Sequence, residues 1–207
     1  SYQARQYCTV FLNISKEESM TAFTTEKIDV EPWFDMELFM GVSQETRLGG
    51  DVMDRFMTLW KNWLPHLTVK GIDTGKIKYL LVALDESVEQ DVDKAWESSP
   101  SNAFLYNALA QTMCMAAVHA VIPEVQDAGC APAPKPTATL REALEAEGIP
   151  YSNDKDPILS RRYAVVTHYP FKGGCEICVL QSNCPKGQGQ MEATSVVLPG
   201  YEHPQQM

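Results

Sequence analysis

The pattern of hydrophobic and polar positions predicts strands that alternate with helices. Residues 6–14, 76–84 and 161–169 are short apolar or β-branched runs, which are typical of strands. Residues 51–64 carry apolar side chains at helical spacing, and residues 102–122 carry small and apolar side chains on nearly every face. We therefore expect three strands and two helices here, and we expect the 102–122 helix to be buried on almost all sides.

Two further helices are predicted from their start signals. Ser87 followed by Gln90 fits a capping box, and Thr139 followed by Glu142 fits another. In contrast, residues 28–40 are apolar but irregular, and the proline within them excludes a helix interior at that position.

The alternation of strands and helices predicts an α/β or α+β domain, and we expect an α+β fold that has a mixed sheet with a long central helix. The length of 207 residues is enough for one large domain or two small ones. We expect residues 1–70 to form an N-terminal region with a strand and a helix, residues 71–170 to form the α/β core, and residues 171–207 to form a metal-binding loop and an extended tail.

The charge balance limits the kinds of partner. The chain has 27 acidic against 17 basic residues and a formal net charge of −10. Such a chain repels nucleic acid and anionic membrane surfaces, so small molecules or proteins are the expected partners. No apolar run approaches a membrane span of about 18 residues, and no basic start precedes an apolar segment, so we expect a cytoplasmic protein. The common nucleotide and hydrolase signatures are missing from the sequence.

The strongest local signal is the stretch GGCEICVLQSNCPKG at residues 173–187. It contains Cys175, Cys178 and Cys184, which is half of the six cysteines of the chain. A CxxC turn can direct two thiolates to one metal atom or to two corners of a cluster, and the preceding glycines let the backbone approach inorganic sulfide. Thiolates are ligands of zinc and of iron–sulfur clusters. The sequence therefore predicts a metal centre in this loop, and we favour a [4Fe–4S] cluster.

A [4Fe–4S] cluster needs a fourth ligand. Cys130 is favoured because it follows a glycine in a Pro-rich connection without regular structure. Cys114 lies in the predicted buried helix, Cys8 lies in the first predicted strand, and His168 precedes the loop by seven residues. These three residues stay open as alternatives.

Three other interpretations of the cysteines remain. Zinc could bind the same ligands. Six cysteines could also form three disulfides in an oxidising compartment, or they could be free thiols without a shared role.

Residues 78–121, KYLLVALDESVEQDVDKAWESSPSNAFLYNALAQTMCMAAVHAV, resemble the activation (reactivation) domain of cobalamin-dependent methionine synthase. They are more similar to small stand-alone relatives of that domain in anaerobes, some of which end in a CxxC…C cluster after a strand. In this chain residues 83–88 stand at the helix start and residues 105–110 stand where the long helix begins. The resemblance covers residues 78–121, plus the terminal cysteine cluster by position.

The resemblance implies a reactivation-domain-like fold and a role beside a corrinoid protein or methyltransferase. The cluster would pass electrons and help to return an oxidised cobalt to its reduced state. The family's S-adenosylmethionine loop reads roughly R-x-(A/S)-P-G-Y, whereas residues 130–134 read CAPAP and contain neither the arginine nor the Gly-Tyr pair. Binding of S-adenosylmethionine in the family manner is therefore not expected.

Two alternative functions follow from the same residues. The protein could be a non-catalytic iron–sulfur subunit, for electron transfer or structure, in a larger anaerobic enzyme complex. It could also be an interaction module that zinc stabilises. Whether the chain is an enzyme is left open.

Overall fold

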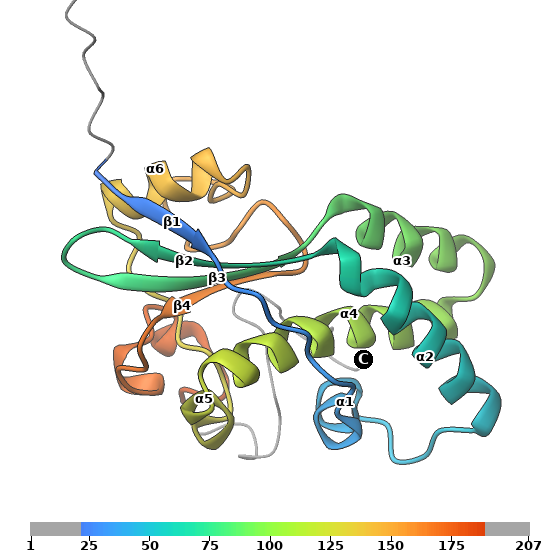
Figure 1. Cartoon of the computed structure of the whole chain (residues 1–207). Helices are drawn as coiled ribbons and strands as arrows, with labels where there is room; N and C mark the ends of the chain where they lie inside the picture. Colours follow the sequence, from blue (N-terminus) through green and yellow to red (C-terminus); the bar gives the residue numbers. More distant parts are fainter. Residues whose placement is uncertain (1–21, 189–207) are drawn as a thin grey trace, which may run out of the picture.

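A computed structural model describes residues 22–188 of the chain (Figure 1). Its strands are β1 (Thr24–Lys27), β2 (Leu67–Asp73), β3 (Lys78–Leu84) and β4 (Ala164–His168). They form one sheet in the order β1-β2-β3-β4, and all three pairings are antiparallel. The predicted α+β class is confirmed, whereas the predicted mixed sheet is wrong for the described residues.

The connection between β2 and β3 explains the central one of these three pairings. A tight turn links the two strands, with Gly75 at a φ of 78° and its N–H donating to the Asp73 carboxylate at 2.8 Å. A turn of this length can join only antiparallel neighbours. The predicted strand at residues 6–14, which contains Cys8, lies outside the described residues.

The helices cover both faces of the sheet. They are α1 (Met36–Ser43), α2 (Gly50–Trp63), α3 (Glu86–Ser98), α4 (Pro100–Val121), α5 (Glu124–Ala128) and α6 (Ala138–Ala146). Figure 1 shows α4 running beneath the sheet with the neighbouring helices around it, while α6 lies on the opposite face. The predicted helices at 51–64 and 102–122 correspond to α2 and α4, and the predicted strands at 76–84 and 161–169 correspond to β3 and β4.

Helix α4 is the centre of the larger hydrophobic core. Every residue from Ala108 to Val118 is buried. Leu80, Val82 and Leu84 of β3 belong to the same core. The prediction that this helix is buried on almost all sides is confirmed.

The length and composition of α4 would also allow it to cross a membrane, and 61% of its most apolar stretch is buried inside the fold. The expectation that no apolar run approaches a span therefore does not hold for α4. A core helix and a membrane span can share the same composition, and the burial of α4 against the sheet and the other helices is that of a core helix.

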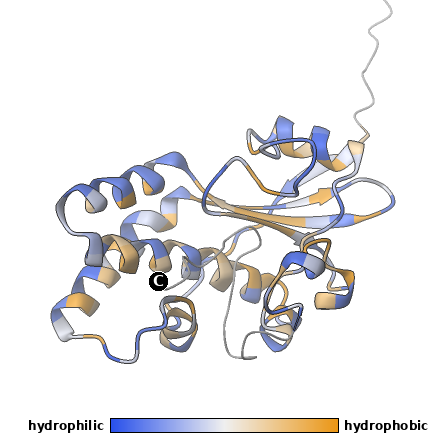
Figure 2. Cartoon of the chain, turned by 180° about the vertical axis from the view of Figure 1, so that it is seen from behind, coloured by the Kyte–Doolittle hydropathy of each residue, from blue (hydrophilic) through white to orange (hydrophobic). Residues whose placement is uncertain are grey.

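The other face of β3 belongs to a second core. Tyr79, Leu81 and Ala83 alternate with the residues that face α4, and they form a cluster with the apolar residues of α6. Both faces of β3 are therefore covered, which explains why its sequence is a continuous apolar run. Figure 2 shows this concentration of hydrophobic residues along the central strands.

Aromatic side chains connect α1 and α2 to α4. The rings of Phe39 and Phe56 lie 5.0 Å apart between their centroids, and Phe56 lies 6.5 Å from Tyr106 on α4. The described part of the 1–70 region thus contributes to the same core as α4, and β2 itself runs across the expected boundary at residue 70.

The helix starts differ from those that the capping boxes predicted. Helix α3 begins at Glu86 because Asp85 caps it, with its carboxylate accepting from the Ser87 N–H at 2.9 Å. Helix α6 begins at Ala138, and its cap is Thr137, which accepts from the N–H of Leu140 at 3.2 Å. In both cases a residue two positions before the predicted cap accepts the hydrogen bond from a free N–H group of the first turn.

Asp85 also anchors α3 to the residue that precedes β2. Its second carboxylate oxygen lies 2.6 Å from Nδ1 of His66, and its backbone N–H donates to the His66 carbonyl at 3.1 Å. Burial alone would raise the pKa of Asp85, but the hydrogen bonds from Ser87 and His66 outweigh it and lower the pKa from its ordinary value of 3.8.

We expect Asp85→Ala to lower the free energy of unfolding by about 1 kcal/mol at neutral pH, because α3 loses its cap. Asp85→Asn is the matched control, since asparagine caps a helix nearly as well. A lowered pKa means that the stabilisation is present above pH 3.8 and is lost as the pH falls through the folded-state pKa. Urea unfolding of all three proteins should therefore show a difference at pH 7 that shrinks in strong acid. Equal stability of wild type and Asp85→Ala at pH 7 would contradict this assignment.

Candidate metal centre

The three-cysteine loop consists of two short 3-10 turns, and each turn leads into a cysteine. The turn at Cys175–Ile177 ends with the Cys178 N–H donating to the Cys175 carbonyl at 3.2 Å. The turn at Gln181–Asn183 ends at Cys184, whose N–H donates to the Gln181 carbonyl at 3.4 Å. Cys178 and Cys184 therefore occupy the same position, directly after a 3-10 turn.

Gly173 enables the chain to enter this loop. Its φ is 143°, and a Cβ atom there would lie only 2.5 Å from Oε1 of Glu176. The same oxygen accepts from the Gly174 N–H at 2.9 Å. Hydrogen bonds from the N–H groups of Glu176 and Gly174 lower the pKa of the Glu176 carboxyl. The glycines therefore serve the turn that presents Cys175.

Cys130 belongs to a separate segment, residues 129–134, which follows α5 directly. We refer to it as the Cys130 segment. Gly129 ends α5 with a φ of 72°, and the following Ala131 and Ala133 are buried. The hydroxyl of Thr167 on β4 donates to the Pro132 carbonyl at 2.9 Å. This buried hydrogen bond fixes the Cys130 segment beside the last strand before the cysteine loop.

Three further hydrogen bonds join the Cys130 segment to the cysteine loop. The Val179 N–H donates to the Ala133 carbonyl at 3.0 Å, and the Ala133 N–H donates to Sγ of Cys178 at 3.4 Å. Nζ of Lys186 donates to the Gly129 carbonyl at 2.7 Å. The residues on either side of Cys130 thus contact the loop that carries the other three cysteines. Ala133 and Cys178, for example, are 45 positions apart in the sequence.

The four thiols influence one another electrostatically. Burial raises the pKa of the Cys130 thiol to about 12, the positive charge of Lys186 opposes this rise, and Cys178, Cys175 and Cys184 add to it. Their contribution is a repulsion between neighbouring thiolates, which a bound cation would remove. This agrees with the hydrogen bonds that hold residues 129–133 against the loop of the other three cysteines.

The cysteines are not gathered around a single point. Within residues 22–188, no group of three or more His, Cys, Asp or Glu side chains is close enough to hold a metal ion. The five cysteines in this part of the chain are all free thiols, so the disulfide interpretation has no support there.

The alternative fourth ligands lie in different environments. Cys114 is enclosed in the core, where its thiol donates to the Tyr163 carbonyl at 3.6 Å and burial raises its pKa to about 12. The ring of His168 packs against Tyr79, 5.5 Å away between ring centroids, and burial lowers its pKa. Adjacent residues of a strand point to opposite faces of the sheet, so His168 and Thr167 do so on β4. Thr167 forms the hydrogen bond to the Cys130 segment, so the side chain of His168 points away from that segment.

Two residues of this site were missed in the sequence. Thr167 had no signal beyond being a polar residue in an apolar strand. Lys186 had a weak signal, because it follows Cys184 by two positions and is the only cation within residues 173–187.

Comparisons of the chain with protein-family models, curated proteins and solved structures give no match. The assignment of the site therefore depends on the chain's own residues.

In reduced, metal-free protein at pH 8, we expect Cys130 to react with iodoacetamide on the order of a hundred times more slowly than in urea-denatured protein. The reason is that the thiolate is the reactive species, and a pKa of about 12 leaves little of it. Mass spectrometry of the quenched peptides gives the rates. Cys114, with its equally raised pKa, is the slow control. A native rate at Cys130 equal to the denatured rate would show that the thiol is not held in the buried position.

Proposed function

We propose that this protein binds a [4Fe–4S] cluster through Cys130, Cys175, Cys178 and Cys184 and uses it to transfer electrons to a protein partner. The observation that carries the proposal is the set of hydrogen bonds that ties the Cys130 segment to the three-cysteine loop. A loop with three thiols and one distant cysteine supplied by the fold gives the four ligands that such a cluster requires.

The entry to the three-cysteine loop favours a cluster over a single zinc ion. Four donors around one zinc ion converge at about 2.3 Å from a single point, whereas a four-iron cluster binds each thiolate at a different iron and also contains inorganic sulfide. Gly173 and Gly174 precede Cys175 and let the backbone approach such a sulfide.

Metal binding and the raised pKa of Cys130 are linked. The thiol must lose its proton when it becomes a ligand, and this loss is unfavourable in the metal-free protein. Lys186 next to the Gly129 carbonyl offsets part of that cost through its positive charge. The same charge favours the more negative, reduced form of a cluster beside it.

The cluster itself supplies one-electron chemistry, and the chain supplies its position and surroundings. On the resemblance of residues 78–121 we propose a corrinoid protein or methyltransferase as the partner and the reduction of its cobalt as the task. The acidic charge of the chain agrees with a protein partner rather than nucleic acid. S-adenosylmethionine is not part of the proposal, because Ala131 and Ala133 of the corresponding segment are buried against the fold.

The first test is cluster assembly in anaerobically reconstituted protein. We expect about four irons and four sulfides per wild-type chain. Cys130→Ser should lose at least half of the iron or lose it quickly in air, because one iron lacks its thiolate. Cys114→Ser is the matched control and should retain the wild-type iron content, since Cys114 is a core residue. Iron and sulfide analysis, together with visible absorption, gives the result.

Two outcomes would contradict the proposed ligands. Full iron in Cys130→Ser with loss of iron in Cys8→Ser would identify Cys8 as the fourth ligand. Protein that takes up zinc and no iron would favour the zinc-stabilised interaction module instead.

The second test concerns electron transfer. Cluster-loaded protein, reduced and then freed of reductant, is mixed with a corrinoid protein in its cob(II) state. We expect the electron paramagnetic resonance signal of the reduced cluster to disappear as the absorption of cob(I) appears, at about one cob(I) per electron. A cluster that stays reduced beside the corrinoid protein would contradict this partner and favour the structural subunit.

A further inference from the structure

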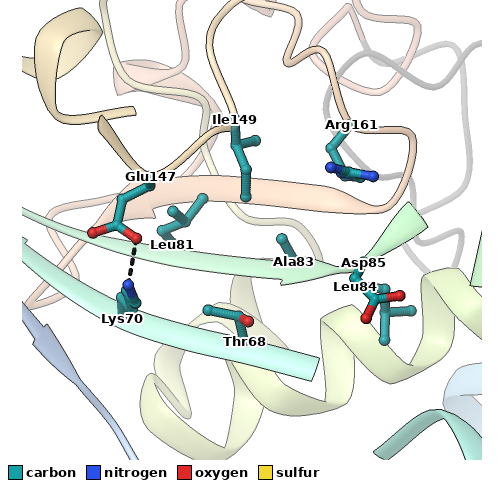
Figure 3. Close-up of a pocket in the computed structure, with 9 residues that line it drawn as sticks. All are labelled: Thr68, Lys70, Leu81, Ala83, Leu84, Asp85, Glu147, Ile149 and Arg161. Atoms are coloured by element: carbon teal, nitrogen blue, oxygen red, sulfur yellow. Dashed lines mark hydrogen bonds and ion pairs between the residues drawn. The ribbon is translucent and has the colours of Figure 1, made fainter. Parts of the chain in front are cut away.

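A cavity of about 240 Å³ lies on the α6 face of the sheet (Figure 3), and none of its lining residues belongs to the cysteine loop. Helix α6 has only nine residues and covers the part of this face near the β2–β3 turn (Figure 1). The remaining part is lined by Leu81 and Ala83 from β3, by Ile149 from the loop after α6 and by Thr68 from β2. The floor of the cavity is therefore apolar apart from the hydroxyl of Thr68.

Charged side chains stand at the two ends of this cavity. At one end Lys70 of β2 forms an ion pair with Glu147, and both side chains are largely buried. Each neutralises the other, so neither is available to a ligand. At the other end Figure 3 shows Arg161 reaching from its loop toward the sheet, across from Asp85.

Arg161 has hydrogen-bonding capacity that the described residues do not use. Its side chain is only 24% exposed, and within the described residues its ion-pair partner is Glu89, whose Oε1 lies 3.9 Å from Nε. That distance is too long for a hydrogen bond, and the same Glu89 oxygen already accepts from the Arg162 N–H at 2.9 Å. A guanidinium has five N–H donors in a planar fork that fits a carboxylate or a phosphate.

We propose that this cavity binds a small monocarboxylate with an apolar body. The carboxylate would take the fork of Arg161, and the apolar body would lie on Leu81, Ala83 and Ile149. Phosphate fits less well, because Asp85 and Glu89 place negative charge beside Arg161 and a dianion is repelled twice as strongly. The floor of the cavity offers a phosphate only the hydroxyl of Thr68. This site is separate from the proposed cluster and does not depend on it.

The experiment uses the full chain and three probes: 4-methylpentanoate, its neutral amide 4-methylpentanamide, and inorganic phosphate. Calorimetry measures affinity, and the amide resonances of ¹⁵N-labelled protein locate the binding. We expect saturable binding of 4-methylpentanoate with shifts at Thr68, Ala83 and Ile149. The neutral amide and phosphate should each bind about tenfold more weakly or not at all, because neither combines a single charge with an apolar body.

Arg161→Gln should weaken 4-methylpentanoate binding by about tenfold or more, since the charged fork is lost. Arg55→Gln, on the exposed side of α2, is the matched control and should bind as wild type does. The comparison of the acid with its amide on wild-type protein remains decisive if Arg161→Gln does not fold. Equal affinities for acid and amide, phosphate binding as tight as the acid, or an unchanged affinity in folded Arg161→Gln would each overturn the proposal.

Discussion

The burial of α4 is the constraint on which the other elements depend. Eleven consecutive residues, Ala108–Val118, are buried, so the helix needs neighbours on every side. The sheet provides one side through β3, and α1, α2 and α3 provide the others. Each of those elements is amphipathic or short and would have little stability alone, because isolated helices of this length are marginal in water. The apolar faces of these elements are buried because they pack against α4.

The position of the proposed metal centre follows from the end of α4. The chain leaves α4 at Val121, turns through α5 and must then cross to the opposite face of the sheet to form α6. It makes this crossing beside β4, where Thr167 holds the Pro132 carbonyl. Strand β4 also leads directly into the three-cysteine loop. The Cys130 segment and this loop are therefore in contact. The cavity beside Arg161 lies on this α6 face of the sheet.

Elements with a strong local pattern could be predicted from the sequence, and elements that depend on tertiary contacts could not. Helix α4 and strand β3 are apolar on all sides, so their burial was visible in the sequence. Strand β2 was missed because Lys70 and Gly71 interrupt its apolar residues, and Lys70 is held there by Glu147, 77 positions away. Helix α1 was missed because its start at Asp35 follows an irregular segment that contains Pro32. For the site, the spacing of Cys175, Cys178 and Cys184 pointed to a metal, but the roles of Thr167, Lys186 and Arg161 arise only from contacts between distant segments.

The central claim is that one cluster is shared by the Cys130 segment and the three-cysteine loop. The most direct measurement is a crystal structure of the anaerobically loaded protein with anomalous scattering recorded at the iron edge. The account predicts one compact group of iron peaks between the two segments, with the sulfurs of Cys130, Cys175, Cys178 and Cys184 each bonded to a different iron. Iron bound without Cys130, or thiols of the loop that point apart with no metal between them, would contradict it.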